Sequence, residues 1–419
     1  MAPGVMVMHY CTHCLWGLFI LQLSNIIRVI GGNMIRQGIA WKGLSVTGRL
    51  VGTAVTVGVV IVSSVAMANA GGYTITNLGT LGGIESNAQR INNSGQVLGV
   101  AQTANGDYHP VLFSNGRVAD LGNIGAIGIN NAGQIVGNNS NGYAALYNNG
   151  TETVLGTLPG YAFSVANSIN DMGQAVGTAL STNSHYTQAV LFSNGIATAL
   201  GILPGGHASY AYSINNSGQA VGYSTTSIYD GPSYATLYGN GQVTNLGGLG
   251  GSQSAAFSIN NSGQAVGFAY TGGDNGTAHA ALFSNGNVVD LGTLPGEGDN
   301  FSFANSINNS GLAVGYAQNY SPTGVWGTGR AVVYSNGTAT DLNSLVDAAN
   351  GWNLTYASDI NDLGQIVGKG ILNGHETAFL LTPDSVATTP IPAASWLLGS
   401  GLIGLFGFRK RQRKGKHYC

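Results

Sequence analysis

Charged residues are scarce in this chain. They make up 7% of its 419 residues, against about 25% in a typical soluble protein. Because 44% of the residues are hydrophobic, the low charge excludes a charge-rich disordered chain, which would combine few apolar residues with high net charge. With only 10 prolines, the sequence also excludes a collagen-like repeat. The chain therefore has the apolar content to build a packed core.

Cysteine is missing from the central part of the chain. The three cysteines, Cys11, Cys14 and Cys419, lie near the two ends. No disulfide is available between residues 71 and 384, so hydrophobic packing and backbone hydrogen bonds must hold this region together. Cys11 and Cys14 have the spacing of half a zinc site, but no second ligand pair follows them. We expect no metal and no cofactor.

Basic residues are almost absent from the same region. All 16 acidic residues fall between Glu85 and Asp384, where only four residues are basic, so this stretch carries a formal charge of 4 − 16 = −12. Such a surface repels phosphate backbones. Nucleic acid is therefore excluded as a partner.

Residues 34–70 have the pattern of a secretory signal peptide. A positively charged segment precedes an uncharged apolar run at residues 50–65, and the small residues Ala68 and Ala70 stand at the −3 and −1 positions of a cleavage site. We expect signal peptidase to cleave after Ala70, which predicts secretion across the inner membrane. A retained N-terminal anchor is the alternative. Residues 1–33 fit neither reading, and we interpret them as an extension from a start codon placed too early.

The C-terminal residues 385–419 have the pattern of a sorting signal. An apolar stretch at residues 393–408 would form a helix only about 24 Å long, short of the ~30 Å hydrocarbon core. The segment resembles the PEP-CTERM signal of Gram-negative bacteria, although Ile391 stands where that signal has glutamate. The resemblance implies processing by an exosortase-type enzyme after transient membrane anchoring, and a plain membrane anchor is the alternative. The residues that carry it are Pro390, Pro392, Arg409, Lys410 and Arg411.

A repeated motif fills residues 71–384. Ile-Asn-Asn/Asp-x-Gly-Gln-x-x-Gly, with one Gln replaced by Leu, begins at Ile91, Ile129, Ile169, Ile214, Ile259, Ile307 and Ile360. A Leu-Phe/Tyr-x-Asn-Gly motif and a Leu-Gly-x-Leu motif recur between these positions. Each unit predicts four short strands, with Asn-Gly as a two-residue hairpin turn. Units of this length with four strands are typical of β-propeller blades.

The order of the partial units predicts ring closure. The repeat region begins with a single Leu-Gly-type strand at residues 73–78, and the last unit lacks its fourth strand. Four-stranded sheets are complete throughout only if the first strand joins the last sheet. We therefore predict an all-β fold, a seven-bladed β-propeller closed by the N-terminal strand. An open β-solenoid is the alternative.

The repeat resembles the HAF family of bacterial extracellular repeats, named for a His-Ala-Phe signature before the Asn-Gly turn. His109 and His279 keep the histidine, and Ala378-Phe379 keeps the rest. Other units have different residues near this position, so we expect the histidine to be a strand residue that packs on its neighbour. The resemblance implies fold and extracellular location but no reaction.

Motifs of catalysis are also absent. The sequence contains no Gly-x-Ser-x-Gly, no His-Glu-x-x-His and no phosphate-binding glycine loop. On the strands expected to be innermost, Asp359 is the only acid that we find, whereas glycoside cleavage needs two carboxylates. We expect a protein that is not an enzyme. A polysaccharide-degrading enzyme on the same scaffold is the alternative.

The loops between the second and third strands vary most in length. Strand alternation places all of them on one face, and aromatic side chains there suit stacking on sugar rings. We therefore expect a secreted structural or binding module at the cell surface, whose partner is an exopolysaccharide or a surface protein. The candidate ligand face comprises Tyr108, Tyr186, Tyr229, Tyr234, Tyr320 and Trp326.

Overall fold

The computed structural model describes residues 72–182, 187–226, 231–273, 276–295, 300–319 and 327–384. These residues form 28 β-strands and two short 3-10 helices, η1 (Leu342–Leu345) and η2 (Ala348–Asn350), with no α-helix among them. No helix in this part of the chain could span a membrane. The signal peptide with Ala68 and Ala70, and the sorting segment with its prolines and basic cluster, lie outside the described residues, so their roles stay predictions.

Each repeat supplies its strands in a fixed order, four in the first six repeats and three in the last. The first strands, which end in Ile-Asn, are β2 (Gly82–Ile91), β6 (Gly125–Ile129), β10 (Phe163–Ile169), β14 (Ala208–Ile214), β18 (Leu249–Ile259), β22 (Phe301–Ile307) and β26 (Trp352–Ile360). The second strands are β3 (Val97–Thr103), β7 (Ile135–Asn138), β11 (Ala175–Leu180), β15 (Ala220–Thr225), β19 (Ala265–Gly273), β23 (Ala313–Gln318) and β27 (Ile366–Leu372).

The outer half of each sheet follows the same order. The third strands are β4 (Tyr108–Ser114), β8 (Ala144–Asn148), β12 (Thr187–Ser193), β16 (Ser233–Gly239), β20 (Ala278–Ser284), β24 (Arg330–Ser335) and β28 (His375–Pro383). The fourth strands are β5 (Arg117–Asp120), β9 (Thr151–Gly156), β13 (Ile196–Ala199), β17 (Gln242–Gly247), β21 (Asn287–Gly292), β25 (Thr338–Asp341) and, for the last repeat, β1 (Tyr73–Asn77).

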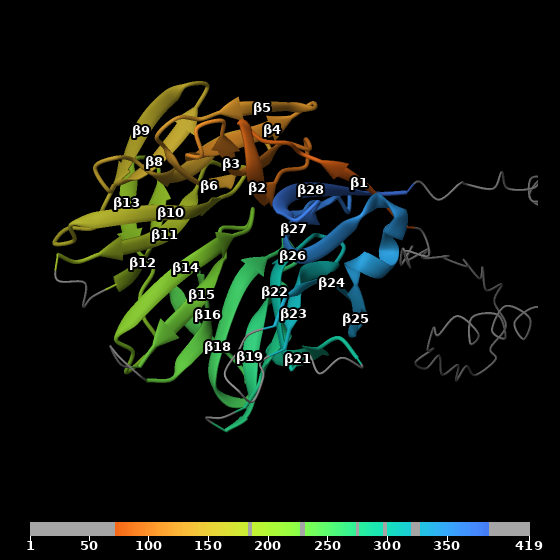
Figure 1. Cartoon of the computed structure of the whole chain (residues 1–419). Coiled ribbons are helices and arrows are strands. Elements are labelled where there is room, and N and C mark those ends of the chain that lie inside the picture. Colours follow the sequence, from red (N-terminus) through yellow and green to blue (C-terminus); the bar gives the residue numbers. More distant parts are fainter. Residues whose placement is uncertain are drawn as a thin grey trace, which may run out of the picture. The chain divides into compact units, whose positions relative to one another are not determined.

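The sheets are arranged around a common centre as a β-propeller (Figure 1). Hydrogen bonding groups the strands into five separate four-stranded sheets and one eight-stranded sheet. The eight-stranded sheet combines the fourth and fifth repeats. They are joined by one parallel residue pair, Ser233 with Gln253. The predicted propeller is therefore confirmed, but the prediction of seven separate blades is wrong, because only five sheets are individual four-stranded blades.

The crossing before β18 differs in composition from three of the other crossings. Three other crossings contain Leu-Pro-Gly, and proline cannot donate a backbone hydrogen bond to a sheet ladder. The crossing before β18 reads Leu249-Gly250-Gly251 instead, and β18 starts there and runs for 11 residues. Gln253 of this strand pairs with Ser233 of β16 in the preceding repeat.

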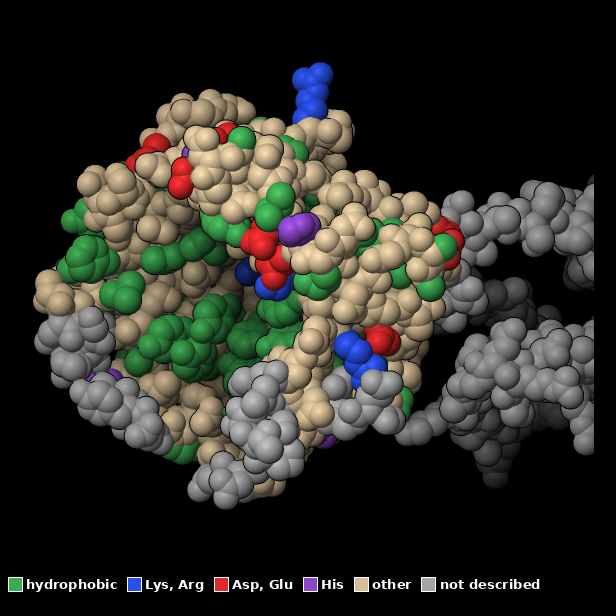
Figure 2. All heavy atoms as spheres, viewed as in Figure 1, with side chains coloured by type: hydrophobic (Ala, Val, Ile, Leu, Met, Phe, Trp, Pro, Cys, Tyr) green, Lys and Arg blue, Asp and Glu red, His purple; other side chains and the backbone are tan. Residues whose placement is uncertain are grey.

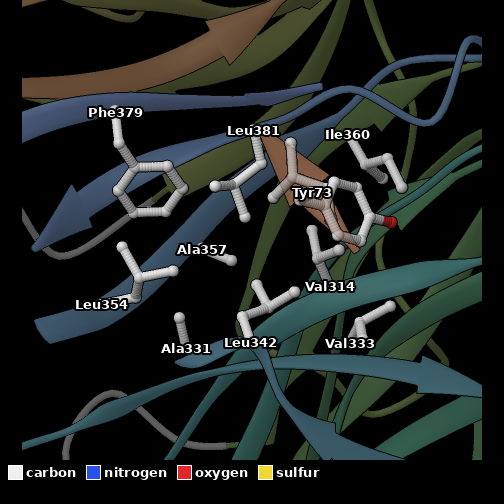
Figure 3. Close-up of a cluster of buried hydrophobic side chains, with 11 residues drawn as sticks. Tyr73, Val314, Ala331, Val333, Leu342, Leu354, Ala357, Ile360, Phe379 and Leu381 are labelled. Atoms are coloured by element: carbon white, nitrogen blue, oxygen red, sulfur yellow. The ribbon is translucent and has the colours of Figure 1, made fainter. Parts of the chain in front are cut away.

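The N-terminal strand closes the last sheet, as predicted. β1 pairs with β28 in antiparallel register from Tyr73 opposite Pro383 to Asn77 opposite Phe379. Tyr73 is buried in a hydrophobic cluster that includes Leu342 and Leu381 (Figure 3). Packing and backbone pairing therefore both hold the two ends of the repeat region together.

The Ile-Asn turns close the circle a second time. In each repeat the amide of the first motif asparagine donates to the backbone carbonyl of the matching asparagine in the next repeat, at 3.0–3.1 Å. The series runs from Asn92 to Asn361, and Asn361 donates back to the carbonyl of Asn92. We call it the asparagine ring. A chain of contacts without an end excludes the open solenoid.

Candidate functional site

A cavity of about 520 Å³ lies among the innermost strands. Nine of its ten lining residues belong to first strands, and the tenth, Lys369, belongs to β27. Figure 2 shows a hollow at the centre of one face, with hydrophobic side chains on its wall and charges of both signs nearby. The lining consists of Asn87, Gln89, Arg90, Ile127, Tyr212, Phe257, Asn305, Tyr356, Ser358 and Lys369. We call it the axial cavity.

Three aromatic side chains line the axial cavity. They are Tyr212, Phe257 and Tyr356, which we call the aromatic arc. They belong to a continuous series of ring contacts with centroid distances of 4.5–5.8 Å. The series runs through Tyr210, Tyr223, Tyr212, Phe257, Phe268, Phe303, Tyr316 and Tyr356. The rings that face the cavity are therefore held from behind by other rings.

The tyrosine hydroxyls of the arc stay protonated at neutral pH. Burial raises the pKa of Tyr212. Burial also raises the pKa of Tyr356, against the opposing influence of the Arg90 charge. Both side chains thus offer an apolar ring face together with a hydroxyl that can donate or accept a hydrogen bond.

The alternation of the first strands places these side chains. Tyr212 and Phe257 occupy the second position before the motif isoleucine, where other repeats have Gln89, Ile127 and Asn305. The Asn305 amide donates to the carbonyl of Ala357 at 2.8 Å, which links two neighbouring first strands. Aromatic and carboxamide side chains therefore line the same wall, with Asn305 between Phe257 and Tyr356 in the order of the first strands.

Two cations complete the lining. The Arg90 guanidinium donates to the carbonyl of Gln89 at 2.9 Å. The Lys369 ammonium lies 2.8 Å from a carboxylate oxygen of Glu376. Both are half-buried, so the protein keeps two charges in a partly desolvated place.

Asp359 lies beneath the axial cavity and lines a second cavity of about 190 Å³ at the Ile-Asn turns. It accepts hydrogen bonds from the Ser306 hydroxyl at 2.5 Å and from the amides of Ile91 and Ile360 at 2.9 and 3.0 Å. Burial raises the pKa of Asp359, and the charge of Arg90 acts in the opposite direction. Its oxygens serve the joint between the last and first repeats.

In each repeat, the residue directly after the asparagine of the asparagine ring is a second asparagine or an aspartate, and these residues border the second cavity. The backbone amide of each such residue donates to the side-chain oxygen of the next one, at 2.8–3.0 Å, around the full circle. Asp171 and Asp362 take part in this circle of turns like the asparagines of the other repeats. Burial raises the pKa of Asp171, but hydrogen bonds from Asn216 and Asn131 outweigh it and lower the pKa below its usual range. These oxygens are already used by the protein itself.

Of the ligand face predicted from the sequence, the structure describes only Tyr108 and Tyr234, so this face stays a prediction. Tyr108 is exposed and donates to Glu85, and Tyr234 is half-buried on another sheet. The other four residues, Tyr186, Tyr229, Tyr320 and Trp326, lie outside the described residues. The aromatic arc was missed because our sequence analysis searched loops. The alternation of the Ile-Asn strands is the signal that could have identified it.

The expectation that Asp359 is the only acid on the innermost strands is wrong, because Glu85 also lies on one of them. β2 begins at Gly82, several residues before the expected strand, so Glu85 also belongs to it. Like β18, this strand follows a crossing without proline. Glu85 lies farther from the Ile-Asn turn than Asn87, toward the loop face, and is absent from the axial cavity lining.

The signature histidines bond within their own sheets. Nδ1 of His109 lies 2.8 Å from an Asp120 carboxylate oxygen, and Nδ1 of His279 lies 2.9 Å from Asp290. Both contacts join the third strand to the fourth. The His109 hydrogen bond is the main reason that the pKa of Asp120 is lowered. No cluster of three metal-binding side chains occurs among the described residues.

Comparison with known proteins adds little to this picture. No family model matches the chain, and no curated protein matches its sequence. An oligogalacturonate lyase in complex with manganese aligns at 11% identity and a TM-score of 0.49, over 75% of this chain and 94% of that one. A prolyl endopeptidase aligns at 11% identity and a TM-score of 0.46, over 74% of this chain and 51% of that one. TolB from Acinetobacter baumannii aligns at 11% identity and a TM-score of 0.34, over 75% of this chain and 80% of that one. Similarity this low carries no functional argument.

Proposed function

We propose that the protein is a carbohydrate-binding module of the cell surface that holds its ligand in the axial cavity. The observation that carries the proposal is the combination of the aromatic arc with side-chain amides in one cavity. Sugar rings present apolar C–H faces that stack on aromatic rings, and hydroxyls that bond to amides. Asn87, Gln89 and Asn305 supply the amides.

The size and rigidity of the cavity support this proposal. Its volume of about 520 Å³ lies within the range of about 300–1,000 Å³ typical of ligand pockets. Tyr356 is backed by Tyr316, with 4.7 Å between ring centroids. Because the rings are already fixed, binding costs little side-chain entropy.

Binding fits the lining better than catalysis does. None of the described residues that line the axial cavity is a carboxylate, whereas glycoside cleavage requires two. We therefore keep the proposal of a binding module over the alternative of a polysaccharide-degrading enzyme.

Sequence features support a location outside the cell. We propose a seven-repeat protein of the HAF type that is exported by its signal peptide and sorted by an exosortase-type system into an exopolysaccharide setting. Mass spectrometry of surface-extracted protein should then find an N-terminus at Gly71 and no peptide from the basic tail. An intact terminus at Cys419 on the cell surface would instead indicate a plain anchor.

Binding by the arc can be tested with Tyr212→Ala and Phe257→Ala in the full chain, purified in mild detergent. Loss of one stacked ring costs on the order of 0.5–1.5 kcal/mol, up to about tenfold in affinity. Binding would be measured on immobilised exopolysaccharide and on a glycan array. Phe163→Ala, which removes a half-exposed ring outside the axial cavity lining, is the matched control and should bind normally.

The same experiment discriminates between the axial cavity and the loop face. Trp326→Ala removes the largest aromatic side chain of the predicted loop face. If this variant loses binding while both arc variants retain it, the ligand binds at the loops. If all variants bind no sugar better than a buffer blank, and the native chain also binds none, the proposed function is wrong.

A further inference from the structure

We infer that the ligand is an acidic saccharide and that Arg90 selects it by binding a sugar carboxylate. This inference rests on the proposed function, since it names the class of sugar that the axial cavity takes. Three observations carry it: the distribution of charge, the free hydrogen-bonding capacity of Arg90, and the departure of Arg90 from the repeat.

The charge of the axial cavity is opposite to that of the rest of the repeat region. Residues 71–384 contain 16 acidic and four basic residues. Two of the four basic residues, Arg90 and Lys369, are among the ten that line this one cavity, and none of the described lining residues is acidic. Because Lys369 is paired with Glu376, Arg90 is the lining cation that favours an anionic ligand at this place, whereas the acidic surface elsewhere disfavours anions.

Arg90 has unused hydrogen-bond donors. A guanidinium carries five N–H groups in a planar fork. In the part of the chain that the structure describes, its hydrogen bond to the Gln89 carbonyl is the only one, and it forms no ion pair within 4.0 Å. Asp359 influences it electrostatically, but the oxygens of Asp359 accept hydrogen bonds from Ser306, Ile91 and Ile360. A planar fork matches a carboxylate in a bidentate pair.

The repeat itself does not require an arginine at this position. The residue before the motif isoleucine is glycine or serine in five repeats. The hydroxyls of Ser213 and Ser258 each accept from a backbone amide of the next repeat, at 3.3 Å. Asp359 does the same toward Ile91. A small acceptor is thus sufficient for the fold, and the long cationic side chain of Arg90 is an addition.

The acids near the loop face limit where a ligand carboxylate can lie. Glu376 holds Lys369, and Glu85 accepts from Tyr108. Their negative charge disfavours a second carboxylate beside them. A carboxylated sugar is therefore directed deeper, to Arg90, while its ring stacks on the aromatic arc.

Matched sugars test the inference. The full chain in mild detergent would be applied to an array on which each uronate oligosaccharide stands beside its carboxyl-reduced counterpart. We expect about tenfold stronger binding to the acidic members, as one charge-assisted pair provides, and a decline with salt. Equal binding, or preference for the reduced sugars, overturns the inference and leaves the proposed function intact. Binding to no sugar overturns both.

Matched variants test the role of Arg90. Arg90→Gln should remove the acidic preference, whereas Arg117→Gln, at an exposed basic residue outside the axial cavity, should keep it. Because Arg90→Gln leaves Asp359 without a nearby cation, the double variant R90S/D359S, which restores the serine of the other repeats at both positions, is the safer test. If R90S/D359S has the same melting temperature as the native chain and still prefers acidic sugars, Arg90 serves only to balance the charge of Asp359 and the inference is wrong.

Discussion

At the scale of single residues, the glycine that ends the Ile-Asn motif shows how tightly the strands pack. A Cβ atom on Gly222 would lie 1.8 Å from the backbone oxygen of Tyr210. The register of β14 shifts between Ala211 and Ser213, next to this contact. The glycine is therefore required because a neighbouring backbone lies too close for any side chain.

Gly222→Ala should lower the free energy of unfolding by about 3 kcal/mol, because the strands must separate to admit the methyl group. Gly239→Ala is the control, since a Cβ there would meet its nearest neighbour, Gln219 Cγ, at an ordinary 3.6 Å. Chemical denaturation of both variants gives the comparison. Similar losses for the two would show that close approach is not the reason for the glycine.

At the scale of strands and turns, the local motifs and the closing strand were predictable, whereas the joined sheet and the aromatic arc were not. Each predicted Asn-Gly turn has its asparagine in the left-handed region, for example Asn285 at φ 51° followed by Gly286 at φ 75°, as a primed hairpin turn requires. The eight-stranded sheet depends on a single residue pair between β16 and β18, Ser233 with Gln253, which no sequence motif specifies. The aromatic arc depends on which face of each first strand points to the axis, and three different repeats contribute to it.

The closing strand is the element with the most distant partner. Deleting residues 73–78 should sharply lower the melting temperature, because the deletion exposes an edge of β28 and uncovers the cluster around Leu342. Thr76→Ala, an exposed change on the same strand, should have almost no effect. Thermal unfolding followed by circular dichroism measures both. An unchanged melting temperature after the deletion would mean that β1 contributes nothing to closure.

At the scale of the whole molecule, the asparagine of the asparagine ring forms the same hydrogen bond to the next repeat in all seven repeats. Asn170 and Asn361 are each 4% exposed. Each side chain makes two donor and two acceptor hydrogen bonds, at 2.9–3.1 Å for Asn170 and 2.8–3.1 Å for Asn361. The two asparagines differ in how far their partner in the next repeat lies along the sequence, because Asn361 bonds to a residue 269 positions away. In a closed circle this difference should not affect stability.

Asn170→Ala and Asn361→Ala should therefore destabilise the protein equally, each by about 2–4 kcal/mol, since each leaves buried backbone groups without partners. In an open array the terminal unit contacts one neighbour only, and a change there would cost less than a change in the middle. Asn287→Ala, at an exposed asparagine, is the control and should be nearly neutral. Equilibrium denaturation of the three variants decides the matter: a clearly smaller loss for Asn361→Ala would mean that the circle is not closed in solution.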